Sequence, residues 1–241
     1  MNNQPYIILV KPQLAENIGM SARAMMNCGL EHLRLVSPRE DHLSPKAVSA
    51  SSGAEEILRN ARVYATTQEA AADLQLVMAT TARPRNQIKM VYTASAAAAE
   101  LQQKLSADIR CGILFGPERT GLQNEDISLA DSVIEIPLNP RHCSLNLAQA
   151  VLLVGYEWYK TQIHGVSARF VTNDTVPASR DTLLHFLEYL EKQLEQSGNF
   201  PLDEKRARMV VNLRNIFTRN SLTEQEINTL YGVINHLAGS K

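Results

Sequence analysis

Short apolar runs alternate with longer helical patterns over the first two thirds of the chain. Five runs stand out: Ile7–Val10, Leu33–Val36, Leu76–Ala79, Ile113–Phe115 and Val133–Ile136. Hydrophobicity in these runs is nearly continuous rather than alternating, which is typical of strands covered on both faces. The pattern therefore predicts an α/β fold with a mostly parallel sheet flanked by helices.

A helix is predicted after the last of these runs, with Ser144 as its N-cap residue. It is expected to be buried, because apolar residues lie nearly all round it: Leu147, Ala150, Val151, Val154 and Trp158. The stretch from Gly165 to Ser179 is rich in Ser, Thr, Asn, Asp and Pro and has no period, as in a linker. These features predict a domain over residues 1–164, a linker over residues 165–179 and an appendage over residues 180–241.

Helical patterns make up the appendage. The first has an amphipathic stripe of Leu183, Leu187, Leu190 and Leu194. The last begins with Thr223 and Glu226 at the spacing of a capping box, and Leu222 and Ile227 occupy the positions of a hydrophobic staple. We expect a small helical unit.

Composition restricts the location and the partners of the protein. Of the 241 residues, 44% are apolar and 20% charged, so the chain can bury a sizeable core. The net charge of -1 gives no global attraction to nucleic acid, so a site for a polyanion must be local. The three cysteines form no CxxC pair, and no metal site is predicted. With neither a signal-peptide pattern nor a membrane-length apolar run, a cytoplasmic protein without membrane contact is expected.

The loops after the predicted strands are the candidates for chemistry, because parallel sheets bind ligands at the carboxyl ends of their strands. The first loop has no GxGxxG pattern, which argues against a dinucleotide. Gly116 to Gly121 matches the glycine spacing of a P-loop, but Leu122-Gln123 replaces the required Lys-Ser/Thr pair. Two interpretations stay open: a simple turn, or a tight loop whose backbone closely approaches a flat ligand.

Several polar residues have an ordinary interpretation beside a functional one. Ser144 and His142 suggest a hydrolase, but no GxSxG elbow surrounds the serine, and an N-cap role fits it better. Arg23 could be a solvated or ion-paired arginine. Lys205, Arg208 and Arg219 share one predicted helical face, which is either solvated or able to neutralise phosphates.

Taken together, three segments carry a specific resemblance: Asn17–Arg23 (NIGMSAR), Phe115–Leu122 (FGPERTGL), and Ile136–Pro140 (IPLNP) followed by Ser144–Ala150 (SLNLAQA). They resemble the three successive motifs of the SPOUT superfamily (SpoU/TrmH type), knotted RNA methyltransferases that use S-adenosyl-L-methionine. TTAR at Thr80–Arg83 and the pattern over residues 212–226 resemble the TrmJ group. Members of that group methylate the ribose 2′-hydroxyl of nucleotide 32 in the tRNA anticodon loop. The resemblance implies a trefoil knot, a tRNA substrate and a homodimer whose sites combine loops of both subunits.

The resemblance also implies roles for individual residues. Arg23 matches the arginine on which the chemistry of the family turns, with Asn17, Glu118 and Ser144 around it as further catalytic residues. Donor-binding positions match Thr80, Thr81, Ala82, Gly116, Leu122, Ile136, Ser144, Leu145 and Asn146. Candidate RNA contacts are Arg23, Arg83, Arg85, Lys205, Arg208 and Arg219.

Other functions compatible with the sequence are methylation of ribosomal RNA or of another tRNA position, because the three motifs serve the donor rather than the target. A SPOUT protein that binds RNA without catalysis is a further alternative, and a Ser/His hydrolase is the third.

Overall fold

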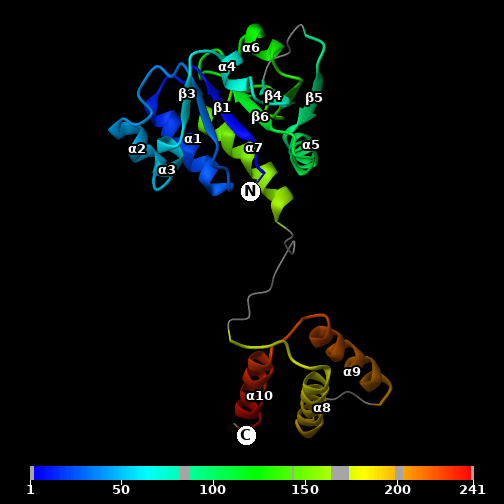
Figure 1. Ribbon diagram of the computed structural model, residues 1–241. Helices are drawn as coiled ribbons and strands as arrows, with labels where there is room; N and C mark the ends of the chain where they lie inside the picture. The colour runs from blue at the N-terminus through cyan, green and yellow to red at the C-terminus, as the bar shows by residue number, and fades with distance from the viewer. Residues whose placement is uncertain (1–2, 82–86, 143, 164–173, 199–202, 240–241) are drawn as a thin grey trace. The chain divides into compact units, whose positions relative to one another are not determined.

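A computed structural model describes residues 3–81, 87–142, 144–163, 174–198 and 203–239 (Figure 1). The chain divides into two compact units, Met1–Gly165 and Val166–Lys241, and each is described by itself. The predicted division into residues 1–164, 165–179 and 180–241 stays a prediction, as does the knot.

The described part of the first unit contains a seven-stranded parallel sheet with the order β3-β2-β1-β6-β4-β7-β5. The bounds of the strands are β1 Tyr6–Val10, β2 Leu33–Val36, β3 Arg62–Tyr64, β4 Leu76–Thr80, β5 Met90–Thr93, β6 Cys111–Phe115 and β7 Ser132–Glu135. The predicted α/β fold is confirmed. The two strands that the apolar pattern did not predict, β3 and β5, are the edges of the sheet. Their side chains are mostly exposed, so they carry no buried apolar run.

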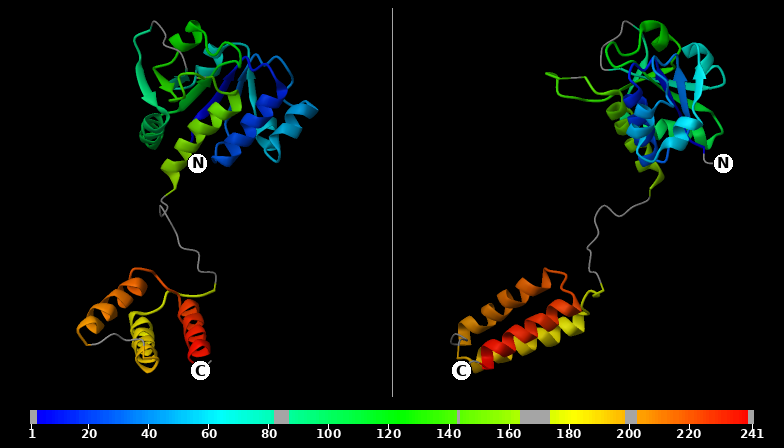
Figure 2. Two further views of the ribbon diagram at one scale, coloured as in Figure 1. Left: turned by 180° about the vertical axis from the view of Figure 1, so that it is seen from behind. Right: turned by 90° about the vertical axis from the view of Figure 1, so that its left-hand side faces the viewer.

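Helices cover both faces of this sheet (Figures 1 and 2). Alternate side chains of β1 belong to different cores, with Ile7 and Leu9 on one face and Ile8 and Val10 on the other. The first core packs against α1 (Ala15–Asn27), α2 (Pro45–Ser51), α3 (Glu55–Arg59), α5 (Ala94–Ser106) and α7 (Leu147–Gln162). The second core packs against α4 (Thr67–Ala71) and α6 (Asn124–Ser128). Burial on both faces explains the continuous apolar runs.

The predicted start and the predicted full burial of α7 were wrong. Its N-cap residue is Asn146, whose side chain accepts a hydrogen bond from the Ala148 amide, and Ser144 lies two residues earlier in an exposed loop. The side chains of Asn146 and Gln149 form a capping box, in which each accepts a hydrogen bond from a backbone amide at the start of the helix. Asn146 therefore caps α7 in place of Ser144. One face of α7 packs into the core, whereas Leu152 and Tyr156 are 40% and 54% exposed on the other.

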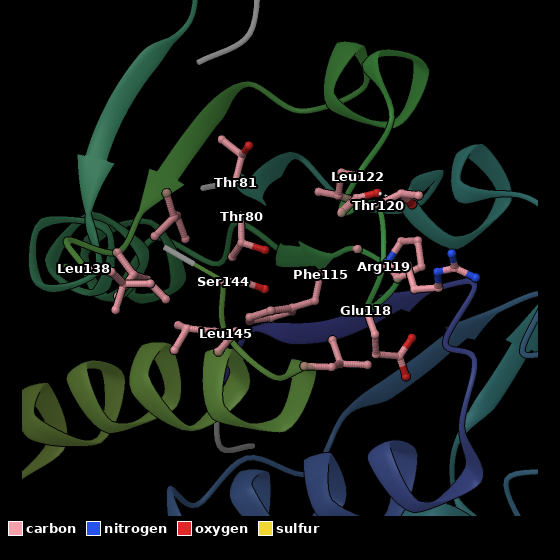
Figure 3. A pocket seen from close by; sticks show the side chains of 17 residues that line it. Thr80, Thr81, Phe115, Glu118, Arg119, Thr120, Leu122, Leu138, Ser144 and Leu145 are labelled. Carbon is pink, nitrogen blue, oxygen red and sulfur yellow. Dashed lines mark hydrogen bonds between the residues drawn. The ribbon is translucent and has the colours of Figure 1, made fainter. Parts of the chain in front are cut away.

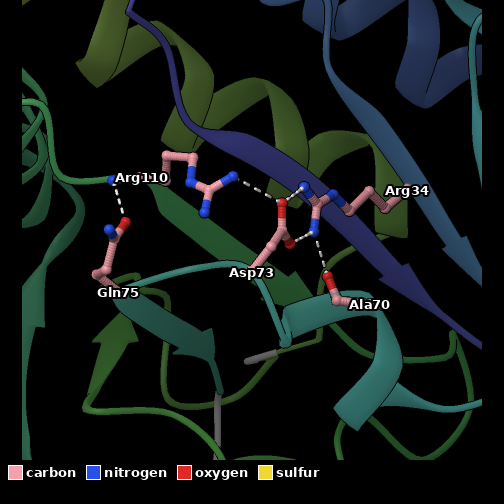
Figure 4. A network of polar contacts seen from close by, with 5 residues as sticks. All are labelled: Arg34, Ala70, Asp73, Gln75 and Arg110. Atoms are coloured by element: carbon pink, nitrogen blue, oxygen red, sulfur yellow. Dashed lines mark hydrogen bonds and ion pairs between the residues drawn. The ribbon is translucent and has the colours of Figure 1, made fainter.

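A buried arginine on β2 joins this strand to α4 and to the residues that follow α4 (Figure 4). The Arg34 side chain is 2% exposed and forms an ion pair with Asp73, in which Nη2 of Arg34 donates to Oδ2 of Asp73 at 2.9 Å. Its guanidinium also donates to the carbonyl of Ala70 and stacks 3.9 Å from the ring centroid of Tyr6. Arg110 reaches the same carboxylate from the surface. The hydrogen bond from Arg34 holds the pKa of Asp73 below its ordinary value.

The second unit consists, in its described residues, of α8 (Arg180–Gln196), α9 (Asp203–Thr218) and α10 (Glu224–Gly239) (Figure 2). Its small core is built on Leu183, Phe186, Leu187 and Ile227. The predicted capping box is confirmed, because the Glu226 amide donates to the Thr223 hydroxyl and the Thr223 amide to the Glu226 carboxylate. Among the described helices, none is long and apolar enough to cross a bilayer.

Candidate active site

A cavity of about 180 Å³ lies at the carboxyl ends of β4, β6 and β7 and is closed on one side by the start of α7 (Figure 3). Its walls come from four segments: Thr80 and Thr81 at the end of β4, residues 115–122 from the end of β6 onward, residues 134–138 from β7 onward, and residues 144–150. Each of the four overlaps a stretch singled out in the sequence: Thr80–Arg83, Phe115–Leu122, Ile136–Pro140 or Ser144–Ala150. The fold therefore brings together loops that lie up to 70 residues apart in the chain.

Glycine is required in the loop after β6. A Cβ atom on Gly116 would lie 2.1 Å from the amide nitrogen of Leu122, so no larger residue fits there. Gly121 has a φ of +65°, a conformation that favours glycine. The loop therefore folds back tightly on itself, and its backbone forms part of the cavity wall. Of the two interpretations of these glycines, the tight ligand-approaching loop is the one that fits the cavity.

The interior of the cavity combines apolar walls with a few hydroxyl groups. Its apolar lining includes Leu122, Ile136, Leu138 and Leu145. The Thr80 hydroxyl donates to the carbonyl of Leu114 at 2.9 Å, which leaves its oxygen able to accept a further hydrogen bond. Figure 3 shows the hydroxyls of Thr80 and Ser144 turned toward the same space. Such a lining suits a flat, mostly apolar ring with polar substituents.

Glu118 connects the cavity to the start of α1. Its carboxylate accepts hydrogen bonds from the amide of Gln13 at 2.9 Å and from the amide of Leu14 at 3.4 Å. Leu14 is the N-cap residue of α1 and has no side chain able to cap the helix. The carboxylate of Glu118 therefore does the work of an N-cap from a distant part of the chain.

Asn17 extends this connection to α7. Its side chain is buried, with 3% exposed, and donates from Nδ2 to Glu118 at 2.7 Å. Its Oδ1 accepts from Nδ2 of Asn146 at 2.9 Å. One residue from each of the three motifs thus belongs to a single hydrogen-bonded chain. The side chains of Asn17 and Asn146 are used to fix the loops to one another.

Arg23 lies apart from the cavity of its own chain. It is exposed on α1, one turn after Met20, which is also exposed, and it does not line the cavity. In this structure, therefore, the guanidinium does not complete the site from within the same chain.

The predicted site residues divide as follows. Lining the cavity are Thr80, Thr81, Gly116, Glu118, Leu122, Ile136, Ser144 and Leu145. Asn17, Asn146 and Arg23 do not line it. Ala82, Arg83 and Arg85 lie outside the described residues, as does the side chain of Lys205, while Arg208 and Arg219 are exposed in the second unit. Sequence reasoning missed Phe115, Pro117, Arg119, Thr120, Gly121, Ile134, Leu138, Leu147 and Ala150 as lining residues. Most of these residues lie inside the motifs already recognised, so treating every residue of each motif as a candidate lining residue would have identified them.

Comparisons with known proteins agree with this geometry. The SpoU rRNA Methylase family matches residues 4–156. The tRNA (cytidine/uridine-2′-O-)-methyltransferase TrmJ of Salmonella typhimurium is 33% identical over 95% of this chain and 93% of its own length. The crystal structure of TrmJ from Z. mobilis is 43% identical, covers 98% of this chain and 99% of its own, and has a TM-score of 0.85.

A structure concerning the 2-OH methylation of C/U34 on tRNA is 25% identical, with a TM-score of 0.53 over 65% of this chain and 95% of its own. The family match covers more than half of the chain, and the TrmJ relatives extend over nearly all of it. The chain therefore belongs to the SpoU methylase family and, within it, to the TrmJ group.

Proposed function

We propose that this protein transfers a methyl group from S-adenosyl-L-methionine to the ribose 2′-hydroxyl of a cytidine or uridine in tRNA, at position 32 of the anticodon loop. The observation that carries the proposal is the likeness to Z. mobilis TrmJ, which extends over both units. A likeness confined to the motifs would support only a shared donor. A likeness that includes the second unit supports a shared RNA target as well.

The cavity fits the donor by its chemistry. Gly116 leaves room for the close approach of an adenine ring to the backbone, and Leu138 and Leu145 offer apolar surface to its faces. The oxygens of Thr80 and Ser144 can pair with the polar groups of the nucleoside. When bound, the donor supplies a methyl carbon attached to a positively charged sulfur.

The contribution of the protein is alignment and charge stabilisation. An in-line attack needs the ribose oxygen held opposite the leaving sulfur, and such alignment accounts for much of the rate. A hydroxyl is a poor nucleophile until its proton moves. Arginine stays protonated and acts as a donor, so we assign Arg23 to gripping the adjoining phosphate and stabilising the developing alkoxide. Asn17 and Glu118 position α1, which carries Arg23, relative to the cavity.

Two copies of the chain are required in this proposal. Arg23 is exposed and does not line the cavity of its own chain. On α7, which packs against α1, the exposed Leu152, Tyr156 and Tyr159 fall on one helical face. A homodimer formed through this apolar face would bury it and supply Arg23 to the cavity of the second copy. The buried free thiols of Cys28 and Cys111 suit the reducing cytoplasm, where we place the enzyme.

The second unit is assigned to RNA binding and support of the dimer. Arg208, Asn212 and Asn215 are exposed on α9, and Arg219 follows the helix. Each cation that contacts a phosphate would add affinity that falls with salt.

The direct test is transfer of a tritiated methyl group to full-length tRNA and to an anticodon stem-loop. A substrate with a 2′-deoxy nucleotide at position 32 should accept no label. Arg23→Lys should keep donor affinity and lose at least about a hundredfold in transfer, since it removes a charge-stabilising donor. Arg59→Lys, the same change at an exposed arginine of α3, is the matched control. Full turnover by Arg23→Lys would contradict the assignment.

A second candidate target is nucleotide 34, which the structure concerning C/U34 favours. The same assay separates the two, because 2′-deoxy substitution at position 34 rather than position 32 would then abolish labelling. Ribosomal RNA, named in the family description, forms the third arm of the assay.

A further inference from the structure

Three exposed cations follow three adjacent strands, at the carboxyl ends of the strands, where the cavity also lies. Lys11 follows β1, Arg39 lies in the loop after β2, and Arg119 lies in the loop after β6. The strand order β2-β1-β6 makes these three loops neighbours. Strand ends two intervals apart lie about 10 Å apart, so the row runs outward from the cavity over the distance of a few nucleotides.

Backbone contacts hold the three loops in a fixed relation. The Lys11 amide donates to the carbonyl of Val36 at 2.8 Å, and the Arg39 amide donates to the carbonyl of Pro12 at 3.0 Å. On the other side, the Gln13 amide donates to Glu118, which precedes Arg119. Lys11 has a φ of +47°, an uncommon conformation for a lysine that these contacts maintain. Hydrogen bonds therefore join the loop after β1 to the loop after β2 and to the loop after β6.

The acidic residues of the same loops are directed elsewhere. Glu118 is occupied by the amides at the start of α1, and Glu40 accepts from the Ala15 amide at 3.2 Å. Asp41 accepts from the Leu43 amide and lies 3.6 Å from His42. By contrast, the side chains of Lys11, Arg39 and Arg119 have no hydrogen-bond or ion-pair partner among the described residues. The carboxylates of Glu118 and Glu40 are thus used at the start of α1, whereas the three cations face solvent.

Arg119 connects the row to the site. It lines the cavity, yet Figure 3 shows its guanidinium turned away from the hydroxyls of Thr80 and Ser144. A cation at the rim of a cavity, followed by two more on neighbouring loops, matches a chain of phosphates that leaves the target ribose. Because the whole chain has a net charge of only -1, RNA binding must depend on local groups of cations such as this row.

We propose that Lys11, Arg39 and Arg119 form a phosphate-binding row that holds the RNA strand flanking the target nucleotide. The proposal rests on the proposed function for the identity of the RNA. The row positions RNA without reading its sequence, because phosphate contacts carry no base information.

The test compares tRNA affinity and its salt dependence, measured by fluorescence anisotropy of labelled tRNA. Lys11→Gln combined with Arg39→Gln should weaken binding about tenfold at moderate salt, and the slope of log K against log salt should fall by about 1.4 to 1.8, or 0.7 to 0.9 for each lost contact. Donor affinity, measured by calorimetry, should not change, because neither residue lines the cavity. Adding Arg119→Gln should lower RNA affinity and the salt slope further.

Arg62→Gln is the matched control, since Arg62 is exposed at the opposite, amino-terminal edge of the same sheet. Wild-type affinity and slope in the Lys11/Arg39 double variant would overturn the row. A protein that binds tRNA through these cations but methylates none would instead contradict the proposed function and leave the row in place. Should tRNA and a mixed-sequence single-stranded RNA both bind independently of the three cations, the row is refuted whatever the activity.

Discussion

In the first unit, the amides at the start of α1 are capped by Glu118, which lies 105 residues further along the chain than Gln13. In the second unit, α10 is capped by Thr223 and Glu226, which are three residues apart. The same chemical need, acceptors for the free amides of a first turn, is met by distant side chains in one unit and by local ones in the other.

This difference has a functional side. The cap that Glu118 supplies to α1 comes from a loop that lines the cavity, so the geometry of α1 and that of the donor site depend on each other. The local cap of α10 depends on nothing outside the second unit. A change at a polar contact should therefore affect catalysis as well as stability in the first unit, and local stability alone in the second.

The largest expected effect on stability concerns the long-range pair of Arg34 and Asp73. Asp73→Ala leaves a buried guanidinium without its ion partner and should cost about 3 kcal/mol of unfolding free energy. Trp158, the single tryptophan, is buried in the first unit, so its fluorescence reports this unfolding. Arg110→Gln removes only the exposed contact to the same carboxylate and should cost less than about 1 kcal/mol. Equal losses in both variants would show that the burial of Arg34 is not what matters.

A smaller loss of stability with a clear loss of activity is expected for Glu118→Gln. Gln keeps one acceptor oxygen but replaces the other with an NH2 group, which would face N–H donors instead of accepting from them and should cost about 1 kcal/mol of unfolding free energy. Because α1 carries Arg23, methyl transfer should fall about tenfold, corresponding to about 1.4 kcal/mol in the barrier. Glu125→Gln, at an exposed position in α6, is the control. Undiminished methyl transfer by Glu118→Gln would show that the capping of α1 by Glu118 does not affect catalysis.

Thr223→Ala should affect the second unit alone. Loss of its N-cap hydroxyl is expected to cost about 1 kcal/mol, measured as a shift in the helical circular dichroism transition. The Trp158 transition should stay in place. Thr229→Ala, which lies within α10 on its exposed side, serves as the comparison. A parallel shift of the Trp158 signal would mean that the two units do not unfold independently.

The smallest expected effect is on acid stability. Hydrogen bonds from Arg34 lower the pKa of Asp73, and hydrogen bonds from Thr223 lower the pKa of Glu226. In each case the folded state binds fewer protons than the unfolded state, so stability present above the unfolded pKa, about 4, is lost as pH falls through the folded one. Asp73→Asn should flatten this loss in the Trp158 signal alone. The change should stay below about 1 kcal/mol, because the Asp73 side chain is 43% exposed and solvent screens it. An unchanged acid profile in Asp73→Asn would exclude the pair as its source.

The sequence by itself determined the fold class, the five interior strands, the local capping box of α10 and the segments that line the cavity. Each of these depends on residues close together in the chain or on burial of whole runs, such as Ile7–Val10. Motif recognition also identified Gly116 and Thr80 as wall residues, because the segments containing them resemble family motifs.

Only the tertiary structure decided which partner each polar side chain has. The sequence could not show that Glu118 caps α1, that Asn146 rather than Ser144 caps α7, or that Arg23 lies outside the cavity of its own chain. The edge strands β3 and β5 also escaped prediction, since half-exposed strands carry no continuous apolar run. The physical reason is the same throughout: burial leaves a periodic trace along the chain, whereas a hydrogen bond between residues a hundred positions apart leaves none.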